Sequence, residues 1–255
     1  MVWDMNMKIY EKLEKMAAKQ ANYFCLLDPD NLEPSKASQM AKICEENGAD
    51  GLLVGGSIML HNNFEKILKA IQKSVHIPVL IFPGIFNFVS PYADALLLLS
   101  VISSRNPQML IGEQVRAAPL IKHYNMEAIA TGYMLIESGN HTSVHYMSNS
   151  LPLPRNKSDI AIAHALAGQY LGMKIIYMDA GSGAHYSISN EMIAAVKENI
   201  QLPLIVGGGI SDAATAKAKA EAGADFVVTG NVIEKNPDPN LIKKIAEAVH
   251  SVKRK

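Results

Sequence analysis

The chain has 255 residues, 49% of them hydrophobic, and its 24 basic and 24 acidic residues give a formal net charge of zero. This length and apolar content suit a single large α/β domain, since barrels of about 250 residues fold as one unit. The lack of a basic excess argues against a nucleic-acid partner. The two cysteines, Cys25 and Cys44, lack metal-ligand spacing and favour a reducing compartment over a disulfide scaffold.

The N-terminal segment, Met1–Gln20, contains charged side chains throughout. It therefore lacks the apolar core of a signal peptide, and we expect a short amphipathic helix that extends a single domain of residues 1–255. The most apolar run, Leu96–Ile102, is far too short to cross a bilayer, so no transmembrane segment is expected. These features together predict a soluble cytoplasmic protein.

Eight short apolar runs, each ending at a polar or glycine-rich turn, predict strands. They are Asn22–Leu27, Asp50–Val54, Val79–Phe82, Ala93–Leu99, Ala128–Ile136, Lys174–Met178, Leu204–Val206 and Ala224–Thr229. Helical spacing predicts the segments Ser35–Gly48, Phe64–Val75, Met109–Tyr124, Ser158–Leu171, Asn190–Glu198, Ser211–Ala222 and Leu241–Val249. Most strands are continuously apolar, as in a parallel sheet that is covered on both faces. The alternation predicts a (β/α)₈ TIM barrel.

Two connections depart from a regular barrel. Only the nine residues Gly84–Tyr92 separate the third and fourth strands, whereas a helical crossover needs at least about ten to twelve. The barrel is therefore expected to be modified, with its third helix replaced by a loop. The longest interruption, Glu137–Lys157, is predicted to be a lid or binding loop.

Active sites of such barrels lie where the strands end. Five residues that follow strands are therefore expected on one face: Asp28, Ser57, Asp179, Gly208 and Asn231. The sixth strand opens into Tyr177–Gly183, in which two glycines allow close backbone approach and the Ser182 hydroxyl suits an anion. A solvated turn that happens to carry an acid is the alternative for this stretch.

The loops after the seventh and eighth strands carry the clearest phosphate signal. Gly207–Gly209 directly precedes a helix that we expect Ser211 to cap, and Thr229–Asn231 supplies the facing loop. Backbone amides and a helix N-terminus bind phosphate at this place in many barrels. A purely structural turn is the competing interpretation.

Two acidic positions suggest chemistry. Asp28-Pro29-Asp30, with Ser57 at the neighbouring strand end, could hold Mg²⁺, which prefers oxygen ligands. Helix capping and a plain turn serine are the alternatives. Asp179 lies next to the predicted phosphate loops, where it could act as a general base on a bound phosphorylated substrate. It could instead cap its loop or orient Tyr177.

These motifs, from Asp28-Pro29-Asp30 to Thr229-Gly230-Asn231, resemble the geranylgeranylglyceryl phosphate synthase family, which includes bacterial heptaprenylglyceryl phosphate synthases. The resemblance covers nearly the whole chain. It implies a Mg²⁺-dependent prenyltransferase that joins the 3-hydroxyl of sn-glycerol 1-phosphate to a polyprenyl diphosphate through an ether bond. Geranylgeranyl diphosphate is the expected donor, and diphosphate is released.

The resemblance also assigns roles at matching positions. It implies Asp28 and Ser57 as metal ligands, and Asp179 with Tyr177 as the catalytic residues, the acid taking the proton of the glycerol hydroxyl. Glycerol phosphate would be bound by Tyr177, Met178, Asp179, Ala180, Gly181, Ser182, Gly183, Gly208, Gly209, Gly230 and Asn231. Further implications are a barrel whose third helix is a loop, a homo-oligomer (dimer or hexamer) and transient membrane contact for the lipid product.

An opening in the helical ring could admit a long apolar chain. Candidate lining residues are Phe82, Ile85, Phe86, Phe88 and Tyr92, with ordinary core packing as the alternative. The chain departs from the family pattern twice: Asp179 stands where Glu is common, and Asn31 where Lys often follows the Asp-Pro-Asp motif. The shorter acid makes its role as a base the sharper question.

Two functions from other classes remain as alternatives. A phosphate-binding barrel lyase or isomerase of small-molecule metabolism would explain the glycine loops but not Asp28 with Ser57. A non-catalytic phospho-ligand binding protein could have kept the phosphate loops and lost chemistry through the shorter acid at Asp179.

Overall fold

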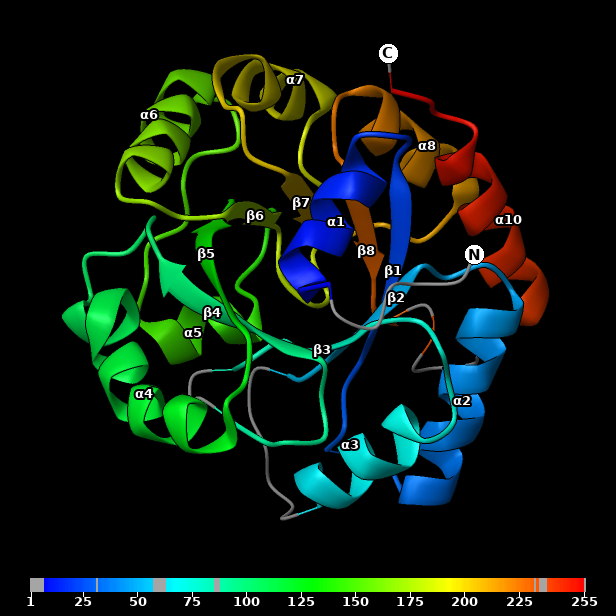
Figure 1. The fold of residues 1–255 in the computed structure, drawn as a ribbon. Coiled ribbons are helices and arrows are strands. Elements are labelled where there is room, and N and C mark those ends of the chain that lie inside the picture. The colour runs from blue at the N-terminus through cyan, green and yellow to red at the C-terminus, as the bar shows by residue number, and fades with distance from the viewer. Residues whose placement is uncertain are drawn as a thin grey trace.

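The computed structural model describes residues 7–30, 32–56, 63–84, 88–231, 233 and 238–254. Eight parallel strands close into a barrel in the order β1 to β8 (Figure 1). The strands are β1 Asn22–Leu27, β2 Gly51–Val54, β3 Val79–Ile81, β4 Ala95–Val101, β5 Ala128–Leu135, β6 Ile175–Asp179, β7 Leu204–Gly207 and β8 Phe226–Thr229. The predicted TIM barrel is confirmed.

Helices surround this barrel, and the N-terminal one lies across one end of it (Figure 1). They are α1 Ile9–Ala17, α2 Pro34–Glu46, α3 Phe64–Gln72, α4 Glu113–Tyr124, α5 Ser143–Ser148, α6 Ser158–Tyr170, α7 Asn190–Asn199, α8 Ala213–Glu221 and α10 Pro239–His250, with a π-helical turn, η1 Gln108–Gly112, directly before α4. Within the described parts of the chain, no helix is both long and apolar enough to span a membrane.

The connection between β3 and β4 contains no helix at its described positions, 82–84 and 88–94. The expected replacement of the third helix by a loop is thereby confirmed for these positions. The physical reason is the length of this connection, which is too short to hold a helical crossover. In Figure 1 the ring of helices is interrupted between α3 and α4.

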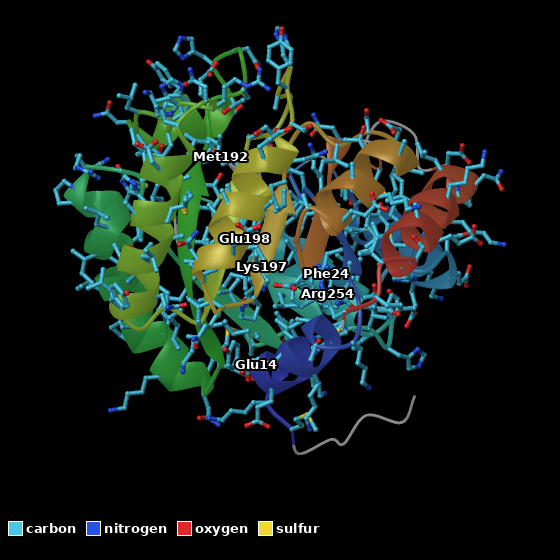
Figure 2. The ribbon with its side chains drawn as sticks, turned by 90° about the horizontal axis from the view of Figure 1, so that it is seen from above. Glu14, Phe24, Met192, Lys197, Glu198 and Arg254 are labelled. Atoms are coloured by element: carbon cyan, nitrogen blue, oxygen red, sulfur yellow. The ribbon has the colours of Figure 1, made fainter. Side chains whose placement is uncertain are left out.

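The apolar core has two layers. One lies between the strands and the surrounding helices, and the other fills the barrel and includes Phe24, Tyr133, Tyr177 and Phe226. Helix α1 belongs to the inner layer, where Leu13 is only 1% exposed. This helix, which carries Glu14, closes the lower end of the barrel in Figure 2.

The closure by α1 is anchored by a distant carboxylate. Glu127, just before β5, accepts hydrogen bonds from the backbone nitrogens of Ile9 at 2.7 Å and Tyr10 at 2.9 Å. An acid at this position satisfies two of the unpaired amides of the first helical turn and complements the helix dipole.

Other acids at the N-terminal ends of the strands are also used structurally. Asp50, Asp94 and Asp225 each accept a backbone N–H at 2.8 Å, from Tyr23, Val79 and Leu204 respectively. Asp225 also pairs with Lys197 at 2.6 Å and Arg254 at 3.4 Å. Carboxylates at this end therefore stabilise the barrel, and the acids that face cavities lie at the opposite end.

Two expectations need correction. The long connection Glu137–Lys157 contains the six-residue helix α5, whose length is too small to give a clear periodic signal. The cap of α8 is Asp212 rather than Ser211, because the Asp212 carboxylate accepts from the backbone nitrogen of Thr215 at 2.8 Å. The glycine-rich turn before the helix thus takes up one more residue than predicted.

The packing of α1 predicts a stability effect. Leu13→Ala should lower the free energy of unfolding by about 2–5 kcal/mol, because it leaves a cavity beneath the barrel. Lys15→Ala, on the exposed side of the same helix, is the matched control and should change stability by less than about 0.5 kcal/mol. Urea denaturation measures both, and equal effects would show that α1 does not seal the barrel.

Candidate active site at the C-terminal ends of the strands

The carboxylate of Asp179 lies at the centre of the site. It ends β6 and is 9% exposed. Its Oδ1 accepts a hydrogen bond from the Gly181 nitrogen at 2.8 Å, and its Oδ2 accepts one from the Tyr133 hydroxyl at 2.7 Å. Burial raises the pKa of Asp179 above its usual value, and these two hydrogen bonds lower it in part. A carboxylate whose pKa is raised is a stronger base once it is ionised.

A cavity of about 240 Å³ lies beside this carboxylate. Three loops line it, and they bring together most of the predicted phosphate-binding residues, namely Tyr177, Asp179, Gly181, Ser182, Gly183, Gly208, Gly209, Gly230 and Asn231. The Ser182 hydroxyl donates to Asn231 Oδ1 at 2.8 Å, which ties the β6 loop to the β8 loop. Clustered glycines with exposed amides form a concavity that suits an anion.

Met178 and Ala180 are placed differently from the rest of this set. Both side chains are buried in the layer between the barrel and the helices, at 0% and 1% exposure. The Ala180 nitrogen donates to the Gly207 carbonyl at 3.1 Å. These two residues therefore hold the loop in place, and their side chains do not line the cavity.

Gly208 allows the β7 loop to pack directly on the β6 loop. Its φ is +82°, and a Cβ there would lie 2.7 Å from Asp179 Oδ1 and from the nitrogens of Ala180 and Gly181. Neither this conformation nor this distance accommodates a side chain. The glycine is thus required for the shape of the cavity wall.

A second cavity of about 180 Å³ meets the first at Asp179. Its lining is mainly apolar and runs from the barrel mouth towards η1 and α4, through Leu26, Phe82, Leu99, Val101, Met109, Tyr133 and Val144. Pro83 and Gly84 of the shortened β3–β4 connection also line it. We call this cavity the apolar groove, and it passes the side of the barrel where the third helix is replaced.

The five aromatic and aliphatic candidates for lining this groove separate into three groups. Phe82 lines it and packs against Tyr177, with ring centroids 5.2 Å apart. Phe88 packs instead on Phe64 at 5.1 Å, and Tyr92 lies under Lys69 at 4.8 Å, so both belong to ordinary packing around α3. Ile85 and Phe86 lie outside the described residues.

Asp28 lies at the polar end of the groove. Its Oδ1 accepts from the Asp30 nitrogen at 2.9 Å, and a Cβ on Gly56 would lie 2.5 Å from its Oδ2. Burial raises the pKa of Asp28. The other expected metal ligand, Ser57, lies outside the described residues.

Among the described residues, no three His, Cys, Asp or Glu side chains gather as a ligand cluster. A single carboxylate at the mouth of a groove nevertheless fits Mg²⁺, which commonly binds through one or two carboxylates together with substrate phosphates and water. Because residue 56 is a glycine, it places no side chain in the space next to Asp28 Oδ2.

Tyr177 has a different relation to Asp179 from the one expected. Its ring lies inside the barrel and lines the glycine-rich cavity beside Asp179, but the phenol that hydrogen-bonds to Asp179 belongs to Tyr133. Burial raises the pKa of Tyr177 well above its usual value, so this phenol stays neutral. Asp179 also caps its loop through Gly181, which was one of the alternatives, while keeping its place between the two cavities.

Two residues that line the site are not predicted by the sequence patterns. Tyr133 of β5 is one, and the alternation of inward-facing positions along β5 is the signal that could have indicated it. Glu113 is the other: it lines the groove, is 7% exposed, and accepts hydrogen bonds from Gln108 and Arg116. An acid in the first turn of a helix is common, so no pattern distinguishes Glu113 as buried.

The glycine geometry predicts a contrast between two substitutions. Gly208→Ala should cost about 1–3 kcal/mol of stability more than Gly172→Ala, because it adds a steric clash to the same strained conformation. Gly172 is the matched control, since its φ is +87° and no atom would lie within 4 Å of a Cβ at that position. Chemical denaturation compares the two, and equal losses would mean that the contact between the β6 and β7 loops is not tight.

The chain is similar to known proteins along almost its whole length. The PcrB family profile matches residues 15–249. The geranylgeranylglyceryl phosphate synthase of Chitinophaga pinensis is 45% identical over 248 residues, which cover 97% of this chain and 98% of that protein. The enzyme of the same name from Thermococcus kodakarensis is 42% identical over 247 residues, covering 96% and 94%.

A solved structure is similar over almost the whole fold. It is the (S)-3-O-geranylgeranylglyceryl phosphate synthase of Thermoplasma acidophilum in complex with its substrate sn-glycerol-1-phosphate. The two share 31% identity and a TM-score of 0.92, and the match covers 96% of this chain and 100% of the other. The family match and these relatives together show that the chain belongs to the PcrB family.

Proposed function

We propose that this protein is a prenyltransferase that joins the 3-hydroxyl of sn-glycerol 1-phosphate to a polyprenyl diphosphate. One observation carries the proposal: a single buried carboxylate, Asp179, borders both a glycine-lined cavity suited to phosphate and an apolar groove. The names of the relatives support the same reaction, and the bound substrate of the Thermoplasma enzyme supports the acceptor. Geranylgeranyl diphosphate is the proposed donor.

In the proposed reaction, the glycerol phosphate would bind with its phosphate among the amides of the three loops and its 3-hydroxyl towards Asp179. The hydroxyl oxygen forms a bond to the allylic C1 carbon as the bond from that carbon to the diphosphate oxygen breaks. Asp179 accepts the hydroxyl proton, and diphosphate leaves. The apolar groove would hold the prenyl chain and exclude water from the allylic carbon.

We propose Mg²⁺ as the cofactor, held by Asp28 and, through the resemblance, by Ser57. When bound, the ion would neutralise charge on the leaving diphosphate. The position of Asp28 at the polar end of the groove supports this assignment, because a diphosphate attached to a chain in the groove would lie beside it. A homo-oligomer, transient membrane contact and a cytoplasmic location stay predictions.

The two alternative functions account for less. A lyase or isomerase of small phosphorylated substrates would use the glycine-lined cavity but would leave the apolar groove without a role. A phospho-ligand binding protein would require that Asp179 cannot act as a base, although it reaches the border of both cavities.

Product analysis tests the proposal. The protein is incubated with sn-glycerol 1-phosphate, Mg²⁺ and prenyl diphosphates of several lengths, with sn-glycerol 3-phosphate as the stereochemical control. An ether product is expected from the first acceptor. Absence of product at every chain length would contradict the proposal, and binding without turnover would favour the non-catalytic alternative.

Asp179→Asn tests the base. The amide keeps the size of the side chain and can still accept from Gly181, so binding of sn-glycerol 1-phosphate should be nearly unchanged. Turnover should fall by roughly 10²- to 10⁴-fold, the usual contribution of a general base. Calorimetry and steady-state kinetics measure the two quantities, and unchanged turnover would reject Asp179 as the base.

Asp28→Asn tests the metal site. It should raise the Mg²⁺ concentration needed for half-maximal activity by roughly 10-fold or more, because loss of the charge weakens a carboxylate ligand. Asp30→Asn, two residues along the same turn, is the comparison and should have the smaller effect. An identical Mg²⁺ dependence in wild type and Asp28→Asn would remove Asp28 from the metal site.

A further inference from the structure

Tyr133 occupies an unusual place within the barrel. It is 2% exposed, and its hydroxyl donates to Asp179 Oδ2 at 2.7 Å. In the strand register Tyr133 lies opposite Tyr177 and Leu135 lies opposite Asp179, so the phenol reaches along the barrel interior to the end of the neighbouring strand. The rings of Tyr177 and Phe82 lie 5.6 and 6.2 Å from the Tyr133 ring and hold it in this direction.

The chemistry of this phenol limits what it can do. Burial, together with the charge of Asp179, raises the pKa of Tyr133 well above its usual value. It therefore stays protonated and acts as a hydrogen-bond donor rather than a base. A role in packing alone would not require the hydroxyl, since phenylalanine would fill the same space.

We propose that Tyr133 is a positioning residue for the reaction proposed above: its hydroxyl fixes the orientation of the Asp179 carboxylate and stabilises the ionised form. The inference rests on the proposed function, because it assigns Tyr133 a role only through Asp179 as the base.

The arrangement of donors around the carboxylate supports this role. Gly181 occupies one lone pair of Oδ1 and Tyr133 one lone pair of Oδ2, and each oxygen has a second lone pair that can accept a substrate hydroxyl. With both oxygens bound, the carboxylate cannot rotate without breaking a hydrogen bond. Without the phenol, the Oδ2 side is released, and the buried charge loses one of its two stabilising donors.

Several other titratable groups border Asp179. Tyr177 lies two residues earlier on the same strand, Asp28 and Glu113 line the apolar groove, and His185 lines the phosphate cavity. The substitution Tyr133→Phe changes none of them. A change in the pH dependence of that variant is therefore assigned to the lost hydroxyl.

The test compares Tyr133→Phe with wild type, with sn-glycerol 1-phosphate, geranylgeranyl diphosphate and Mg²⁺ as reactants. A base must be ionised, and loss of a donor makes ionisation harder, so the acid limb of the kcat profile should move up by about one pH unit. The plateau kcat should fall about 10-fold because the base is less well oriented. The dissociation constant of sn-glycerol 1-phosphate, measured by calorimetry, should change less than about 3-fold and verify the fold.

Tyr23→Phe is the matched control. Tyr23 is also a buried strand tyrosine, at 0% exposure, and its hydroxyl shares a 2.6 Å hydrogen bond with Thr229 Oγ1. Its acid limb should coincide with that of wild type. A Tyr133→Phe profile that also coincides with wild type would overturn the inference.

A double-mutant cycle gives the second readout. In the Asp179→Asn background, Tyr133→Phe should cause little further loss, because the phenol acts through the carboxylate. Losses that multiply would show that Tyr133 acts independently and would overturn the inference. Lack of ether product from wild type would instead overturn the proposed function, and this inference with it.

Discussion

The site depends on the hydrogen bonds that the buried carboxylate of Asp179 accepts. Burial disfavours its charge, and only two donors, Gly181 and Tyr133, offset this effect among the described residues. Between the usual pKa of an aspartate and the raised value in the fold, the folded chain binds more protons than the unfolded chain. The contribution of this group to stability is therefore full below the unfolded pKa and is lost as the pH rises through the folded pKa. The ionised state that the proposed reaction needs is thus the one in which this group stabilises the fold less.

The acids at the two ends of the barrel have different surroundings. At the lower end, α1 seals the interior, and Asp50, Asp94 and Asp225 are all engaged with backbone amides. That end is closed, and these three acids have hydrogen-bond partners. At the upper end the loops are rich in glycine, and Asp28 and Asp179 face cavities instead.

The shortened β3–β4 connection contributes to the apolar groove. The described positions of this connection contain no helix, and its residues Phe82, Pro83 and Gly84 line the apolar groove. Asp179 borders both this groove and the glycine-lined cavity. In the proposed reaction, this change in one connection of a common fold would bring an apolar chain next to a phosphorylated acceptor.

Much of this could be predicted from sequence because it depends on local patterns. Strand runs, glycine loops and the nine-residue spacing each extend over only a few residues, and all eight strands are predicted correctly. The role of Tyr133 could not be predicted in this way, since its contact with Asp179 depends on the register between β5 and β6. Glu113 resembles an ordinary first-turn acid, and α5 is too short to show a period. Met178 and Ala180 lie in the layer between the strands and the helices, and strand alternation explains this position better than the motif that contains them.

A crystal structure with sn-glycerol 1-phosphate and an unreactive thio-analogue of geranylgeranyl diphosphate would test the central claim most directly. The account predicts the glycerol 3-hydroxyl within about 3 Å of an Asp179 carboxylate oxygen, directly or through one water, with the prenyl chain in the apolar groove. A 3-hydroxyl that points away from Asp179, or a prenyl chain bound elsewhere, would contradict it.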